Sequence, residues 1–135
     1  MQLSDRTGLT ALRVLVATQL VIHGSYRTLA GGVVPFGGWL AEQGVPFGPL
    51  AAGLLTAIEV LGGLALMSGR LVRPLAAWFA LQLLLGIVMV HWPEGWFVVG
   101  GGRNGMEYSV VLIGGLGIVG LTAPPAPRPR GSGGA

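Results

Sequence analysis

The chain contains no cysteine and no lysine, and charged side chains make up only 10% of its 135 residues. The absence of cysteine excludes disulfide bonds, thiolate metal sites and cysteine nucleophiles. Soluble domains carry about 25% charged residues, so these charges are too few to cover a water-soluble globule of this size. Hydrophobic residues make up 52% of the chain, with a mean hydropathy of +0.72. The composition therefore indicates a membrane protein.

Four continuous apolar runs are each long enough to cross a bilayer as a helix of about 20 residues. They cover about residues 9–30, 50–68, 74–92 and 106–122. The runs do not alternate between apolar and polar residues, as the strands of a membrane barrel would. We therefore expect an all-α integral membrane protein, a four-transmembrane-helix bundle that forms one domain over residues 1–122. The Pro/Gly-rich tail, residues 123–135, is expected to be disordered.

The arginines predict the orientation of the bundle. Six of the eight fall on one side of a four-span topology, and they are Arg6, Arg13, Arg70, Arg73, Arg128 and Arg130. Basic loops stay on the cytoplasmic side of a membrane. We therefore expect both termini in the cytoplasm and a multi-pass protein of the cell's inner (plasma) membrane. Because the arginines flank apolar runs, they are read as topology signals and no nucleic acid is expected as a partner.

The segment between the first two runs, residues 31–49, mixes glycine and proline with aromatic residues. We expect it to lie at the membrane interface, with a short helix near residues 39–43. Trp92 and Trp96 mark the same boundary in the connection before the last run. These aromatic residues predict either a belt at the level of the lipid headgroups or a lid over a ligand site.

Glu59 is the only charged residue between Phe47 and Arg70. A carboxylate at such a depth is costly in a membrane, so it marks a functional site or a polar packing contact. Counting the rise of each helix places Gln19 near the same depth, and Gln19 is therefore the expected neighbour of Glu59. Burial favours the neutral, proton-donating form of a carboxyl group. Glu59 is a candidate proton relay, and the alternative is a packing role through a hydrogen bond.

A second group of polar residues is expected nearer the outer boundary. The same counting places His23, His91 and Glu107, from three different helices, in one layer. Gln19, His23 and Arg27 are spaced four residues apart, so they form a polar stripe on one helix. Lipid disfavours such a stripe, which should face the bundle interior. The expected ligand-binding residues are therefore Gln19, His23, Arg27, His91 and Glu107.

Each member of this layer also has a simpler interpretation. The two histidines could contact water or headgroups at the interface. Glu107 could interact with the positive end of the last helix dipole, or pair with Arg103. These alternatives remain open at the level of the sequence.

Imidazole and carboxylate groups suit a quinone, whose two carbonyls need hydrogen-bond donors and a nearby proton acceptor. A quinone is therefore the candidate cofactor. Two histidines on different helices could also hold a haem, and the whole set could hold a transition metal. The chain lacks the repeated ExxH pattern of a di-iron bundle, and neither haem nor metal is favoured. No phosphate loop, nucleophile elbow or HExxH motif is present.

Several motifs, in order along the chain, resemble those of DoxX-type membrane proteins. They are His23-Gly24-Ser25-Tyr26-Arg27 (HGxxK/R), Gly44-Val45-Pro46 (GxP), the run ExxGGxxLxxGxxxR from Glu59 to Arg73, and an HxxxGFF…GG…EY element that begins at His91. Trp96 stands where the family usually has phenylalanine, and the Gly-Pro-Gly near the end of the last helix is absent. The resemblance implies a four-helix membrane bundle. Members have been named as subunits of quinol oxidases or thiosulfate:quinone oxidoreductases, which implies quinone-linked redox work.

Three hypotheses for the function follow. The first is an accessory, non-catalytic subunit of a quinone-linked membrane oxidoreductase, with a His/Glu pocket near the outer leaflet. The second is a structural or assembly subunit of a membrane complex, without chemistry of its own. The third is a small-solute or proton pathway, although four helices enclose little volume and no inverted repeat is visible. The expected partners are the lipid membrane, other membrane or redox subunits, and a second copy in a homo-oligomer.

Overall fold

The computed structural model describes residues 4–99 and 102–124, which form five α-helices and no strand. The helices are α1 (Asp5–Leu29), α2 (Val33–Glu42), α3 (Gly48–Met67), α4 (Val72–Gly86) and α5 (Glu107–Thr122). α4 continues into a π turn, Ile87–His91, in which Trp92 N–H donates to Ile87 O at 2.8 Å. The expected all-α class is confirmed.

Three segments are long and apolar enough to cross a membrane: α1, α3 and the stretch Val72–His91 that joins α4 to its π turn. α5 is also apolar but has only 16 residues. The fourth predicted run thus forms a helix, and its crossing of the membrane stays a prediction, as does the cytoplasmic side of the termini. The interfacial helix expected near residues 39–43 is α2, which begins earlier, at Val33.

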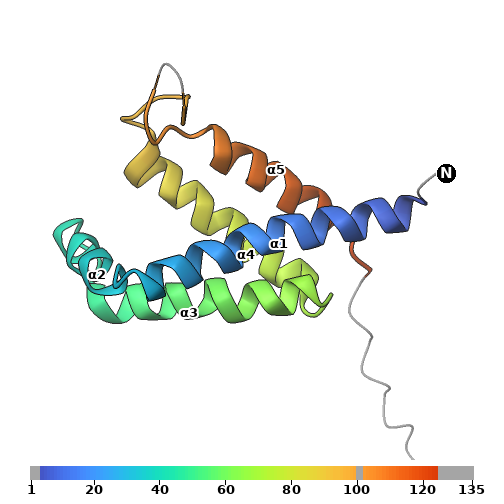
Figure 1. The fold of residues 1–135 in the computed structure, drawn as a ribbon, viewed down its shortest axis with the longest axis horizontal. Helices are drawn as coiled ribbons and strands as arrows, with labels where there is room; N and C mark the ends of the chain where they lie inside the picture. Colours follow the sequence, from blue (N-terminus) through green and yellow to red (C-terminus); the bar gives the residue numbers. More distant parts are fainter. Residues whose placement is uncertain (1–3, 100–101, 125–135) are drawn as a thin grey trace, which may run out of the picture.

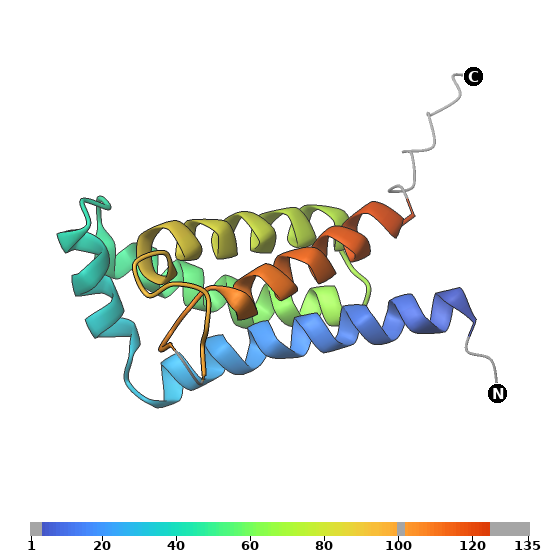
Figure 2. The same cartoon turned by 90° about the horizontal axis from the view of Figure 1, so that it is seen from above.

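The helices are arranged as two pairs, with α1 along α3 and α4 along α5 (Figure 1). One end of the bundle, called here the termini end, holds the start of α1, the turn from α3 to α4 and the end of α5 (Figure 2). α2 and the connection from the π turn to α5 lie at the opposite end, called here the α2 end.

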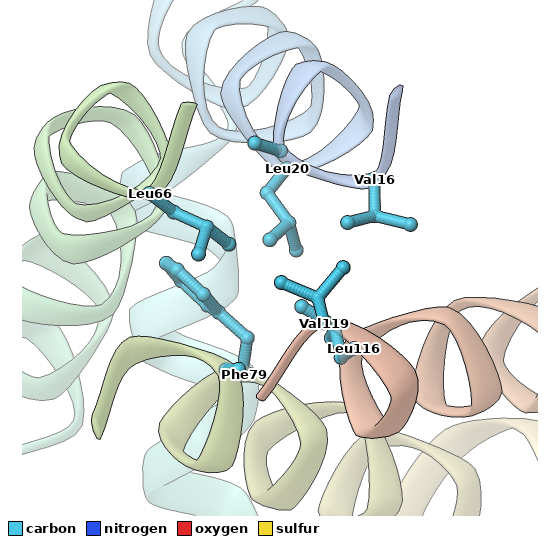
Figure 3. Close-up of a cluster of buried hydrophobic side chains, with 8 residues drawn as sticks. Val16, Leu20, Leu66, Phe79, Leu116 and Val119 are labelled. Carbon is cyan, nitrogen blue, oxygen red and sulfur yellow. The ribbon is translucent and has the colours of Figure 1, made fainter. Parts of the chain in front are cut away.

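A cluster of buried apolar side chains joins the two pairs. It consists of Val16, Ala17, Leu20, Leu66, Ala76, Phe79, Leu116 and Val119, from α1, α3, α4 and α5 (Figure 3). Helices in lipid gain little from hydrophobic burial, so close packing must hold them together. Glycine allows that approach between α1 and α5, because a Cβ on Gly115 would lie only 2.8 Å from Val16 Cγ1.

The predicted tail begins where α5 ends. Ala123 is buried, and its carbonyl oxygen accepts a hydrogen bond from Arg73 Nε at 3.0 Å. The remainder of the tail, residues 125–135 with Arg128 and Arg130, lies outside the described residues.

Candidate functional site: a buried ion pair between α1 and α3

Glu59 lies in the middle of α3 with only 3% of its surface exposed, and it is paired with Arg27 from the last turn of α1. Arg27 Nη1 donates to Glu59 Oε2 at 2.8 Å, and Nη2 donates to Oε1 at 3.4 Å. Nη1 also donates to Thr56 Oγ1 at 3.1 Å, one turn earlier on α3. A buried charge is tolerated when it is paired and its remaining lone pairs are satisfied, and this geometry meets that requirement.

The aromatic ring of Phe36 covers the guanidinium group from α2. The ring centroid lies 4.6 Å from Arg27 Cζ, which is cation–π distance. Phe36 in turn stacks on Trp39 in the same helix, with 6.1 Å between the ring centroids. Three helices, α1, α2 and α3, therefore meet at Arg27.

A fourth helix reaches Glu59 through Gln82 of α4, whose side-chain amide nitrogen donates to Glu59 Oε1. Arg27, Thr56, Glu59 and Gln82 are called here the Arg27–Glu59 network. Within the described chain, Arg27 and Gln82 donate all of the side-chain hydrogen bonds to the Glu59 oxygens. The other end of the Gln82 amide, Oε1, is buried and has no partner among the residues that the structure describes.

Gly24 brings α1 close enough to α3 for this pair to form. It lies one turn before Arg27, and a Cβ at this position would lie 2.9 Å from Glu59 Cβ and 3.0 Å from Val60 Cγ2. Such distances are shorter than side chains tolerate, so the two backbones can lie this close only because residue 24 is glycine.

The prediction that Gln19 is the neighbour of Glu59 is wrong. Gln19 is exposed on α1, and the partners of Glu59 are Arg27 and Gln82 instead. Four residues span more than one helical turn, so a stripe with this spacing rotates by about 40° at each step. The stripe on α1 therefore cannot present Gln19 and Arg27 to α3 together. The sequence predicted an isolated carboxyl group at Glu59. In the structure Glu59 instead forms an ion pair with Arg27.

The histidine–carboxylate layer is divided between the bundle and the connection before α5. His91, in the π turn, donates from Nδ1 to the carbonyl oxygen of Asn104 at 2.7 Å. Glu107, in the first turn of α5, accepts the backbone N–H of Val98 at 3.0 Å. Both side chains thus fix the connection at the α2 end.

His23 is exposed on α1 and makes no hydrogen bond to the described part of the chain. It lies within electrostatic range of Glu59, Arg27 and His91. In the described chain His23 is therefore bonded neither to the Arg27–Glu59 network nor to the connection before α5.

The role of His91 leads to a testable prediction. His91→Leu removes the donor to Asn104 and should destabilise the connection by about 1 kcal/mol, the usual net contribution of one hydrogen bond. Hydrogen exchange should become faster in residues 92–99 and 102–106 and stay unchanged in α1 and α3. Glu94→Gln, an exposed change in the same connection, is the matched control. Unchanged exchange in His91→Leu would contradict this role.

An open hollow of about 390 Å³ lies beside the network, where α1, α2 and α3 meet. Its lining is mostly apolar and consists of Thr28, Val33, Gly53, Thr56, Ala57, Val60 and Leu61. Thr56 connects the hollow to the Arg27–Glu59 network, because it lines the hollow and accepts a hydrogen bond from Arg27. Within residues 4–99 and 102–124, no three His, Asp or Glu side chains gather closely enough to hold a metal ion.

Three residues of the site, Gln82, Thr56 and Phe36, were not predicted from the sequence. Gln82 is the one amide in the third apolar run, and Thr56 lies one turn before Glu59, so both gave a signal that could have been used. Phe36 gave none, because its position over Arg27 depends on how α2 folds back.

Comparison with known proteins agrees with the architecture. The DoxX family model matches residues 8–92, which is well over half of the chain and includes the whole Arg27–Glu59 network. The match ends before Glu107 and α5. No curated protein and no solved structure matches the chain significantly. The chain belongs to the DoxX family and is a membrane protein with transmembrane helices.

Proposed function

We propose that this protein is an accessory subunit of a quinone-linked redox system and that the quinone head binds in the hollow beside Thr56. The observation that carries the proposal is the position of Thr56, which lines an apolar hollow open at the surface and accepts a hydrogen bond from Arg27. Quinones dissolve in the bilayer, so they would reach such a hollow from the lipid. The hollow of about 390 Å³ falls in the range of small-molecule sites.

We infer that Arg27, which is bonded to Thr56 at the edge of the hollow, supplies the polar contact. A guanidinium group has five N–H donors, of which the three hydrogen bonds to Thr56 and Glu59 use three, so two remain for a ligand carbonyl. Glu59 then holds Arg27 in place, which differs from the proton-relay role expected from the sequence. The expected ligands His23, His91, Gln19 and Glu107 are not needed for this mode of binding.

The test is the quinone content of protein extracted gently, without prior delipidation. The wild type should retain quinone at a constant ratio to protein, measured by solvent extraction and chromatography. Ala57→Phe should fill the hollow and remove most of the quinone without touching the ion pair. Ala77→Phe, at an exposed alanine of α4 outside the hollow, is the matched control and should keep it. Absence of quinone from the wild type, or equal loss in both variants, would refute the proposal.

The second candidate, a structural or assembly subunit, is favoured by a different observation. The Arg27–Glu59 network ties α1, α3 and α4 together, and Phe36 adds α2. For this role, Glu59→Gln should lower the stability or the yield of a complex and leave quinone content and turnover unchanged. No specific feature of the described residues favours the third hypothesis, a small-solute or proton pathway.

A further inference from the structure

The termini end of the bundle carries an excess of positive charge that the proposed quinone site does not use. Its described charged residues are Asp5, Arg6, Arg13, Arg70 and Arg73, so four positive charges and one negative charge give a formal total of +3. Glu59 is the one acid in an ion pair within the described residues, and its partner is Arg27. The four arginines at this end are therefore not neutralised by neighbouring carboxylates of the described chain.

Arg13 has the most unusual environment of the four. Its side chain crosses from α1 to the α3–α4 turn, where Cζ, Nη1 and Nη2 would each lie 3.3 Å from a Cβ on Gly69. The guanidinium group of Arg13 thus packs directly over Gly69, the residue that precedes Arg70 in the chain. Gly69 has a φ of +84°, a conformation that favours glycine, so the turn is shaped to leave this space for Arg13.

The donors of Arg13 lack acceptors within the described chain. Its Nε is buried without a hydrogen-bond partner there. Buried N–H groups are nearly always bonded, so an unbonded one requires an explanation. By contrast, Arg73 uses its Nε to bond Ala123 at the end of α5. Arg13, which packs on Gly69, and the exposed Arg70, which follows Gly69 in the chain, therefore both lack a side-chain acceptor in the described chain.

The surroundings indicate which acceptor fits. Leu71, between Arg70 and Arg73, is 68% exposed, and Leu121, near the end of α5, is 84% exposed. Exposed leucines beside arginines are typical of the boundary between hydrocarbon and headgroups in a membrane protein. Guanidinium groups bind phosphate oxygens in pairs of hydrogen bonds. A molecule with a phosphate head and apolar chains satisfies both the arginines and the leucines.

We propose that Arg13, which packs on Gly69, and Arg70, which follows Gly69 in the chain, bind the phosphate of an anionic phospholipid in the leaflet at the termini end. The acyl chains would lie along the exposed leucines. A free phosphate has the same head chemistry but would leave Leu71 and Leu121 uncovered, so the lipid is the expected ligand. This site is independent of the hollow beside Thr56 and of the proposed quinone binding.

The test compares lipids that differ only in charge. The purified protein is titrated at low salt with phosphatidylglycerol or phosphatidylcholine, and the bound lipid is counted by native mass spectrometry. Phosphatidylglycerol should bind more tightly. Arg13→Gln and Arg70→Gln should each weaken it about fivefold, because one basic residue contributes about 1 kcal/mol near an anionic surface. Arg13→Lys, which keeps the charge but loses the planar fork, should weaken it less.

Arg103→Gln provides the matched control, because Arg103 is exposed in the connection before α5 and not in the α3–α4 turn. This variant should bind phosphatidylglycerol like the wild type. Arg70 is exposed, so Arg70→Gln should fold normally and keeps the test valid if Arg13→Gln fails to fold. Equal binding of the two lipids, an equal loss in Arg103→Gln, or displacement of the lipid by inorganic phosphate at the same concentration would overturn the proposal.

Discussion

Arg27→Met is expected to lower the free energy of unfolding by about 3–5 kcal/mol, because it leaves the buried carboxylate of Glu59 without its cation. Glu59→Leu should cost less. The Arg27 side chain is 14% exposed and lies near the end of α1, so it can turn its head group towards water, whereas the Glu59 side chain is 4% exposed and cannot. The double variant should be more stable than Arg27→Met alone, because no buried charge then remains.

The measurement is reversible unfolding in mixed micelles, followed by helical circular dichroism, for a complete double-mutant cycle. The cycle should give a coupling energy between residues 27 and 59 that a pair of independent residues would lack. Arg103→Met serves as the control, because Arg103 is exposed and has no ion pair in the described chain. It should leave the free energy of unfolding almost unchanged. Additive effects of the two substitutions, or equal costs for them, would show that the ion pair does not contribute in this way.

Gly24→Ala is the second substitution with a large expected effect, about 1–3 kcal/mol of destabilisation. The added Cβ would meet Glu59 Cβ at 2.9 Å and Val60 Cγ2 at 3.0 Å. Neither atom is the end of a flexible chain, so α1 must move away from α3. Because Gly24 lies one turn before Arg27, the movement should also reduce the coupling energy between Arg27 and Glu59.

Gly114→Ala in α5 is the control for this prediction. A Cβ on Gly114 would meet nothing within 4 Å, and alanine favours a helix more than glycine does. The same unfolding measurement should therefore give unchanged or slightly higher stability. If Gly24→Ala behaves like Gly114→Ala, the close approach of α1 and α3 does not limit stability.

The helices could be predicted well from the sequence because the length of an apolar run fixes the length of a spanning helix. The predicted run 50–68 corresponds to α3, Gly48–Met67, and the run 74–92 to Val72–His91. The position of Glu59 within α3 was equally accessible, since it depends only on the residue count along the apolar run.

The partners of Glu59 could not be predicted in the same way. A count of helical rise gives the height of a Cα atom, but it gives neither the rotation of the helix nor the reach of a side chain. Side chains on a helix lean towards its N-terminus. The long Arg27 side chain therefore extends from the end of α1 back towards the middle of the bundle, where it meets Glu59. Gly24, and not Gln19, lies level with Glu59, because a Cβ on Gly24 would lie 2.9 Å from Glu59 Cβ.

Gln82 supplies the one side-chain hydrogen bond between the α1–α3 pair and the α4–α5 pair in the described part of the chain. If one pair shears past the other, this bond is the polar contact that must break, while both bonds to Arg27 stay inside the first pair. The number of hydrogen bonds that Glu59 accepts therefore depends on the register of the two helix pairs. Its oxygens accept three hydrogen bonds when the pairs are in register and two when they have shifted.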